Sequence, residues 1–192
     1  LNGVAGTPSA WITIMGPTSG SPAVIQGESC CNTVQLYGCR YLAIRNLTID
    51  GRGLDVDGIN AGDPSSHHIL IEKCTLINLG NNQSTVAIST KTPVWNWTVR
   101  GNTIIEPGTG MYFGNSTGSD PFIAGIVEGN FVKHPIGYCM EIKHQNPYTL
   151  QAGMPAGPNR TIVRNNVFIK DDRPSPSGDR PNFLVGEFPD TG

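Results

Sequence analysis

A six-residue pattern that recurs along the chain is the feature that most constrains its fold. Each copy begins with an aliphatic residue, carries a charge at its second residue and is apolar at its sixth. The five copies are Ile44–Ile49, Ile71–Leu76, Val99–Ile104, Val127–Val132 and Val163–Phe168. Their first residues lie 27, 28, 28 and 36 positions apart, and the last interval holds a Gly/Pro-rich insertion over Pro147–Asn159. A regular period of this length is typical of a solenoid, in which each repeat forms one coil that stacks on its neighbour.

Short segments between these copies predict a second strand in every coil. They are Val34–Leu36, Gly58–Asn60, Ala87–Ser89, Tyr112–Gly114, Glu141–Lys143 and Leu184–Gly186. Apolar and polar residues alternate in them, which places one side of each strand toward a core and the other side outward. Glycine and Asx residues such as Asp50-Gly51 mark corners. We therefore predict coils of two or three short strands without helices, stacked at the strand spacing of about 4.8 Å.

The fourth residue of the pattern predicts a hydrogen-bonded ladder along the stack. It is asparagine in the last three copies, at Asn102, Asn130 and Asn166. Side-chain amides at one position of successive coils can bond to each other and satisfy the backbone at a bend. The alternative is that these asparagines occupy left-handed turn positions. Leucine-rich repeats have a similar period, but their Leu-x-x-Leu-x-Leu pattern is missing, and propeller blades need roughly 40 residues or more.

Composition excludes several classes of protein. A length of 192 residues predicts one domain over residues 1–192. The formal net charge of −2 gives no basic field for nucleic acid. No apolar run approaches the roughly 18 residues of a membrane helix, so we expect no membrane insertion. Because Leu1 is not an initiator Met, we expect a piece of a longer protein, whose open solenoid ends are capped by absent sequence or a partner chain.

The cysteines predict buried thiols and leave one disulfide open. There are five, and none forms a Cys-x-x-Cys pair, so a zinc site is not expected. In an oxidising compartment either Cys30 or Cys31 can pair with Cys39. Cys74 and Cys139 lie in apolar strand patterns and are predicted to be buried.

The pattern hydrophobic-x-x-Asn-x-hydrophobic, once per coil and with Gly-rich corners, resembles that of the pectate-lyase-like superfamily. The resemblance covers Ala23–Phe188. It implies an all-β fold, a right-handed parallel β-helix of about six coils of roughly 28 residues each. It also implies a secreted or cell-surface protein whose partner is a polysaccharide. The superfamily includes lyases, polygalacturonases, epimerases and non-catalytic adhesins, so the fold alone does not define the activity.

One face of the predicted solenoid suits a sugar chain. If Ile59, Ile88, Phe113, Ile142 and Val185 face the core, their neighbours face outward. The predicted outward row is Asn60, Ser89, Tyr112, Glu141 and Lys143, with Asp57 and Lys91 at strand edges and His144 directly after Glu141–Lys143. Polar side chains can bond to hydroxyls, and an aromatic ring can stack on a sugar ring. We therefore predict a substrate groove here; the alternative is an ordinary solvated sheet face.

Lys143 is the candidate general base. Uronate lyases remove the proton on the carbon next to the sugar carboxylate, which needs a base and a cation that stabilises the enolate-like intermediate. Lys143 resembles the lysine of β-helix alginate and chondroitin lyases, which also use an arginine in the next coil. That region spans Arg173–Arg180, and Arg180 is the candidate cation, on a loop predicted to cross the groove. The alternative is a surface Glu141–Lys143 ion pair of little energetic value, in which Glu141 raises the pKa of the lysine.

A cluster of carboxylates predicts a calcium site. Asp55, Asp57 and Asp63 surround one strand entrance, and Ca²⁺ prefers oxygen ligands and would neutralise a uronate carboxylate. The alternative is turn chemistry, because Asp favours corners. Inverting hydrolysis is disfavoured, because Asp57 and Glu141 are about 14 Å apart at the strand spacing, whereas such carboxylates lie about 6.5–9.5 Å apart.

These patterns lead to two functional expectations. The first is a secreted enzyme that cleaves acidic polysaccharide by β-elimination. The second is a non-catalytic carbohydrate-binding or surface-structural β-helix, in which the same row of side chains only binds.

Overall fold

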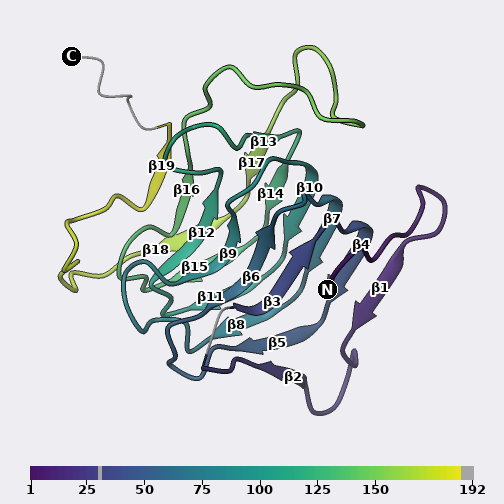
Figure 1. The fold of residues 1–192 in the computed structure, drawn as a ribbon. Coiled ribbons are helices and arrows are strands. Elements are labelled where there is room, and N and C mark those ends of the chain that lie inside the picture. The colour runs from purple at the N-terminus through teal and green to yellow at the C-terminus, as the bar shows by residue number, and fades with distance from the viewer. Residues whose placement is uncertain (30–31, 187–192) are drawn as a thin grey trace, which may run out of the picture.

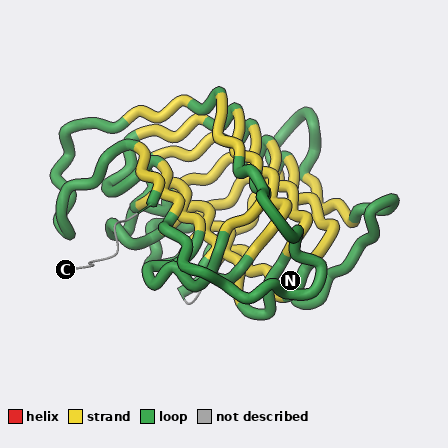
Figure 2. Tube along the Cα trace, turned by 90° about the horizontal axis from the view of Figure 1, so that it is seen from above, coloured by secondary structure: helices red, strands yellow, loops and turns green. Residues whose placement is uncertain are grey.

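Parallel strands wind around one axis in stacked coils, and loops join them at the corners (Figure 1). The computed structural model describes residues 1–29 and 32–186. Seen from above, the strands lie over one another in layers, with loops gathered around them (Figure 2). The described residues contain no helix long and apolar enough to cross a membrane. The predicted all-β parallel solenoid is confirmed.

Each coil adds one strand to each of three parallel sheets. The groove sheet contains β3 (Asn32–Tyr37), β6 (Asp57–Gly62), β9 (Val86–Thr90), β12 (Thr109–Phe113), β16 (Met140–Ile142) and β19 (Phe183–Val185). The ion-pair sheet contains β1 (Ile12–Met15), β4 (Arg40–Arg45), β7 (His67–Glu72), β10 (Val94–Arg100), β14 (Ile126–Glu128), β17 (Ile162–Arg164) and the short β13 (Phe122–Ile123). The third sheet contains β2 (Ala23–Gln26), β5 (Leu47–Asp50), β8 (Thr75–Ile77), β11 (Thr103–Ile105), β15 (Phe131–Lys133) and β18 (Val167–Ile169).

The number of turns is slightly smaller than predicted. Each sheet stacks six strands along its main path in the described residues, and the solenoid makes about five turns. The sequence pattern predicted about six coils. The difference arises because six stacked strands enclose five steps from the first coil to the last.

The six-residue repeat forms the corner between the ion-pair sheet and the third sheet. Its first residues pair in register on the ion-pair sheet, as Ile44 does with Ile71. Its sixth residues pair on the third sheet, as Leu76 does with Ile104. The third residue of each copy has a φ of 52–63°, which turns the chain through the left-handed region. Gly101 is one of these residues and adopts this conformation without a steric penalty.

The asparagine ladder is confirmed at the residue that follows each left-handed corner. Asn102 donates from Nδ2 to Asn130 Oδ1 at 2.9 Å, and Asn130 donates to Asn166 Oδ1 at 2.9 Å. Asn130 Oδ1 also accepts the Asn102 N–H at 3.0 Å, and Asn130 Nδ2 donates to the Val99 carbonyl at 2.9 Å. Asn102 and Asn130 therefore each bond to the next coil, and all three amides donate to backbone carbonyls at the bend. The alternative, left-handed asparagines, is wrong for these three residues because the preceding residue makes the turn.

Apolar side chains fill the interior in columns that run from coil to coil. On the groove sheet, one column is Ile59, Ile88, Met111 and Met140, and the next is Ala61, Thr90, Phe113, Ile142 and Val185. Ile59, Ile88, Phe113 and Ile142 are buried, as predicted. Val185 keeps register with Ile142 but is 63% exposed, because no described coil stacks on it.

Apolar side chains are exposed at both ends of the stack. They include Trp11, Met15 and Val24 in the first coil and Ile162, Val167 and Phe183 in the last. Edge strands with unpaired backbone groups are a template for further pairing. Their covering by another segment or chain stays a prediction.

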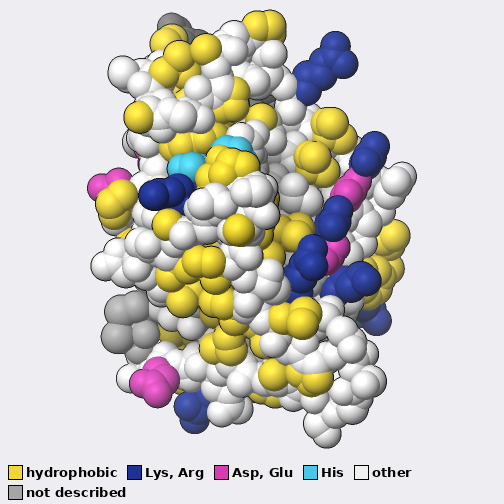
Figure 3. Space-filling view, turned by 90° about the vertical axis from the view of Figure 1, so that its right-hand side faces the viewer, with side chains coloured by type: hydrophobic (Ala, Val, Ile, Leu, Met, Phe, Trp, Pro, Cys, Tyr) yellow, Lys and Arg dark blue, Asp and Glu magenta, His cyan; other side chains and the backbone are white. Residues whose placement is uncertain are grey.

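The second residues of the repeat form one column of alternating charge on the ion-pair sheet. Figure 3 shows basic and acidic side chains in turn along this face. Glu72 pairs with Arg45 at 2.9 Å and with Arg100 at 2.5 Å, and Glu128 pairs with Arg164 at 2.7 Å. Exposed pairs of this kind contribute little stability each, because water screens them. The column is a solvated face, as the alternating charges indicated.

The described cysteines are buried free thiols. Cys39, Cys74 and Cys139 are each at most 1% exposed. Burial raises the pKa of Cys139 to about 12 and also raises that of Cys74. Cys30 and Cys31, the predicted disulfide partners of Cys39, lie outside the described residues.

We expect these three thiols to be inert in the folded protein. Burial slows alkylation of all three, and because thiolate is the reactive form, the raised pKa of Cys74 and Cys139 slows their alkylation further. In a variant with Cys30 and Cys31 changed to serine, iodoacetamide at pH 8 should label no cysteine in an hour but all three in urea, as counted by mass spectrometry. Fast labelling of Cys74 or Cys139 under native conditions would contradict their burial.

The insertion folds back over the ion-pair sheet. Met154 packs against Trp95 and Ile123, and these three form a small apolar cluster outside the main core. Trp95 also stacks on the His67 ring, with 4.5 Å between centroids. Burial, helped by the neighbouring His68, lowers the pKa of His67 to about 4.

Because the pKa of His67 is lowered, we expect the folded protein to lose stability in mild acid. The ordinary pKa is 6.5, so between pH 6.5 and 4 the unfolded chain binds a proton that the folded protein does not. The contribution is complete above pH 6.5 and declines as the pH falls. Because the ring is only partly buried, we expect His67 to account for about 1 kcal/mol of the loss at pH 5. Urea titrations at pH 7 and pH 5 measure the change in the free energy of unfolding. If His67→Gln lost as much stability as wild type between these pH values, His67 would not be the group responsible.

Candidate functional site

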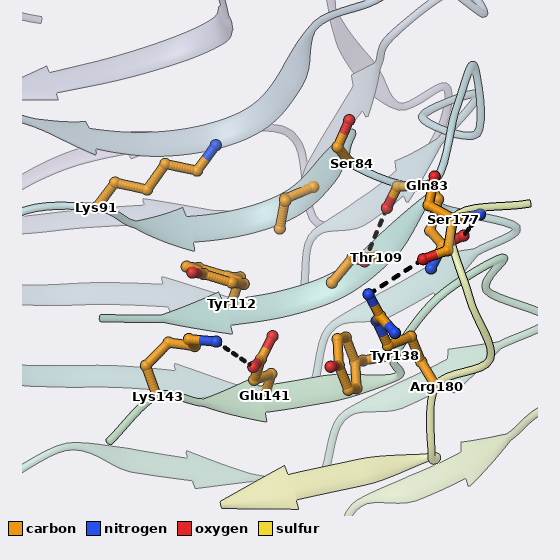
Figure 4. A pocket seen from close by; sticks show the side chains of 11 residues that line it. Gln83, Ser84, Lys91, Thr109, Tyr112, Tyr138, Glu141, Lys143, Ser177 and Arg180 are labelled. Carbon is orange, nitrogen blue, oxygen red and sulfur yellow. Dashed lines mark hydrogen bonds and ion pairs between the residues drawn. The ribbon is translucent and has the colours of Figure 1, made fainter. Parts of the chain in front are cut away.

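A groove of about 350 Å³ lies on the outer face of the groove sheet. Its floor is formed by side chains of β9, β12 and β16, and a segment from the last coil forms one wall (Figure 4). Five of the residues named from the sequence line it, namely Lys91, Tyr112, Glu141, Lys143 and Arg180. The alternation of the strand places Glu141 and Lys143 on the outer side, because Ile142 between them faces the core.

Lys143 and Glu141 form an ion pair that is largely withdrawn from water. Lys143 Nζ lies 2.9 Å from Glu141 Oε1, and the two side chains are 6% and 2% exposed. The ammonium also lies over the Tyr112 ring, 5.8 Å from its centroid. Taking two charges out of water costs free energy that the pair must recover through close contact. The pair is therefore not the solvated surface pair that the sequence left open.

Arg180, the candidate cation, is part of the wall of the groove. Its guanidinium is 5.7 Å from the Tyr138 ring centroid. It also donates to the carbonyls of Ser177 and Asp179, both at 3.2 Å. Tyr112 and Tyr138 thus each form a cation–π interaction, with Lys143 and Arg180 respectively.

The predicted metal ligands are separated in the structure. Asp57 is buried, and its carboxylate accepts the Val86 N–H at 2.8 Å and pairs with Lys91 Nζ at 3.1 Å. Asp55 instead accepts from Asn82 Nδ2 at 2.7 Å. Asp63 precedes a cis peptide bond to proline.

No three or more His, Cys, Asp or Glu side chains within residues 1–29 and 32–186 form a group that could hold a metal ion. The three aspartates therefore do not assemble a Ca²⁺ site by themselves. Calcium binding stays a prediction, tested below with the substrate present.

The predicted outward row exists, but only part of it lines the groove. Strand register aligns Asn60, Ser89, Tyr112 and Glu141 across four coils. Asn60 donates to Ser89 Oγ at 2.6 Å, and both side chains also contact the Asp57 carboxylate. Their polar groups are thus used within the protein. Asn60 is 5% exposed and Ser89 is 0% exposed, and neither side chain lines the groove.

His144 also lies outside the groove lining. It packs beside Gly118, where an added Cβ would lie 2.6 Å from the ring. Its Nδ1 atom is buried without a hydrogen-bond partner in the described structure. A direct role in substrate binding, as predicted for His144, stays a prediction.

Sequence reasoning singled out none of six further residues that line the groove, which are Gln83, Ser84, Val86, Thr109, Tyr138 and Ser177. Tyr138 lies two residues before β16, and Gln83 lies in the loop between β8 and β9. Both lie outside the alternating strand pattern that located the row. The signal for Tyr138 was its spacing of 29 residues from Thr109, which also lines the groove. No comparable sequence signal pointed to Gln83.

The charges and rings of the groove suit an anionic ligand with ring faces. Three cationic side chains, Lys91, Lys143 and Arg180, line it together with one carboxylate, Glu141. Lys91 is itself paired with Asp57 at the strand edge. Cations bind carboxylates through charge-assisted hydrogen bonds. Tyrosine rings provide flat apolar surfaces beside them.

Comparisons with known proteins return no match to this chain. No protein-family model matches it, and neither the curated proteins nor the solved structures include a significant similarity.

Proposed function

We propose that the groove binds an acidic, uronate-containing polysaccharide and cleaves it by β-elimination. The observation that carries this proposal is the buried Lys143–Glu141 pair on the floor of a groove that Arg180 borders. Lys143 lies on the outer side of the groove sheet and lines the groove, in which the proposal places the sugar chain. A secreted or cell-surface location follows from such a substrate.

The reaction requires a neutral amine and a nearby cation. In the proposed mechanism, the pair reacts in its neutral form, with the proton on Glu141, and Lys143 removes the proton next to the uronate carboxylate. The electron pair left on carbon forms the double bond as the bond to the neighbouring glycosidic oxygen breaks. That oxygen takes up the proton carried by Lys143. Arg180 stabilises the charge that develops on the carboxylate in between.

A second candidate function is non-catalytic binding of the same polysaccharide. The close contact between Lys143 and Glu141 favours it, because in the charged form the carboxylate stabilises the ammonium and opposes its use as a base. The groove would then only hold the sugar chain.

One assay separates the two functions. The protein is incubated with pectate, alginate and chondroitin, with and without Ca²⁺, and the ultraviolet absorbance of unsaturated uronate is followed. A rise for one of these polymers supports the lyase. A flat absorbance with each polymer overturns it, and retained binding to the polymer then supports the second function. A rise only with Ca²⁺ would support a metal site completed by substrate.

A further inference from the structure

A strap over Lys170–Asn182 leaves the last coil and returns across the side of the solenoid, forming one wall of the groove (Figure 4). Its root is fixed by side-chain bonds to the preceding coil. Ser175, which is 8% exposed, donates from Oγ to the Ile136 carbonyl at 2.6 Å. Arg173 donates to the His134 carbonyl and pairs with Asp171 at 2.9 Å.

The tip of the strap is held by one glutamine from a distant coil. Gln83 Oε1 accepts the Ser177 N–H at 2.9 Å, and Gln83 Nε2 donates to the Gly178 carbonyl at 2.9 Å. The partners are more than 90 residues apart in sequence. The side-chain amide of Gln83 therefore makes two bonds to adjacent strap residues. Its oxygen accepts from an N–H, and its nitrogen donates to a carbonyl.

Gln83 is itself held in a rigid turn. Its carbonyl accepts from Thr109 Oγ1 at 3.0 Å. On its flanks, Asn82 Oδ1 accepts the N–H groups of Ser84 at 2.8 Å and Thr85 at 3.2 Å. The glutamine therefore extends from a well-bonded loop of the solenoid body, which makes it a fixed anchor for the strap.

Arg180 is the strap residue whose position depends on this anchor. Its guanidinium bonds to the Ser177 carbonyl, in the same residue whose N–H is held by Gln83. It also lies over Tyr138 and lines the groove. Gln83 and Arg180 are therefore connected through a single residue, Ser177, which bonds to Gln83 through its N–H and to Arg180 through its carbonyl.

We propose that Gln83 is a positioning residue that clamps the strap and so sets where Arg180 stands in the groove. The effect on ligand rests on the proposed function, whereas the clamp itself does not. Gln83→Ala removes both bonds to the strap. Gln83→Glu keeps the acceptor but loses the donor to Gly178.

Amide hydrogen exchange tests the clamp without any ligand. Compared with wild type, Gln83→Ala should speed exchange of the Ser177 and Gly178 amides about tenfold, with a smaller increase in Gln83→Glu. Exchange in β10 should not change. Gln151→Ala, an exposed glutamine of the insertion, is the matched control. Unchanged exchange in the strap of Gln83→Ala overturns the proposal.

A double-mutant cycle tests the positioning of Arg180. Gln83→Ala should raise KM for the cleaved polysaccharide about tenfold; partial unfolding would lower apparent kcat and leave KM unchanged. In an Arg180→Ala background the same change should have no further effect on KM. For a protein that binds without cleaving, Kd for the uronate oligosaccharide replaces KM.

Independent, additive effects of the two substitutions would overturn the positioning role while leaving the proposed function intact. A wild-type protein that neither binds nor cleaves the three polysaccharides would overturn the proposed function and the positioning role with it. Faster strap exchange in Gln83→Ala would still support the clamp in that case.

Discussion

Replacing Lys143 with alanine is expected to lower the rate of unsaturated-uronate formation about 10²- to 10⁴-fold, the usual contribution of a general base. The substitution removes the amine on the groove floor that is proposed to take the substrate proton. The measurement is the initial rise in ultraviolet absorbance with the polymer that wild type cleaves. Lys133→Ala, on the third sheet and outside the groove, is the matched control and should keep wild-type activity.

Loss of folding must be separated from loss of chemistry in this test. Lys143→Ala removes one member of a buried ion pair and keeps the buried Glu141, a change that costs about 3–5 kcal/mol. The double variant Lys143→Met, Glu141→Gln removes both charges at similar volume and should stay folded by circular dichroism, yet remain inactive. Full activity in this folded double variant would rule Lys143 out as the base.

Replacing Asn130 with alanine is expected to lower the free energy of unfolding by about 3–4 kcal/mol, because several buried polar groups lose their partners together. Asn130 is 1% exposed and bonds to the coils on both sides. Its loss strands the Asn102 N–H and the Val99 carbonyl at a bend that water cannot reach freely. Equilibrium urea unfolding, monitored by tryptophan fluorescence, measures the change.

A surface asparagine provides the comparison for this prediction. Asn81 is exposed, donates to the Gly53 carbonyl at 3.0 Å and accepts from Asn82 Nδ2 at 3.1 Å, so Asn81→Ala should cost at most about 1 kcal/mol. Equal costs for the two substitutions would show that the ladder adds nothing beyond exposed hydrogen bonds of this kind.

The coil architecture was predictable because the repeat carries its own register. Side chains of one kind at a constant spacing must stack when coils stack, so Asn102, Asn130 and Asn166 form a ladder. The same reasoning aligned Ser89, Tyr112 and Glu141 on one face.

The groove was only partly predictable, because loops and side-chain partners do not follow the period. For Asp57 the sequence allowed either calcium binding or turn chemistry, and nothing in the period indicated that its oxygens bond to Lys91 and to the β9 backbone. The clamp between Gln83 and the strap joins residues more than 90 positions apart, where no repeat relates them. Val185 has the core register, yet its exposure depends on whether another coil covers it.

The most direct test of the account is a footprint of an acidic oligosaccharide on the protein, read by amide hydrogen exchange with and without ligand. Uronate oligosaccharides are compared with the same oligosaccharides after their carboxyl groups have been reduced to alcohols. We expect amide exchange in β12, β16 and the strap to become slower when the uronate oligosaccharides bind. With the reduced oligosaccharides, exchange in these segments should not change. No protection by any uronate, or protection confined to the ion-pair sheet, would contradict it.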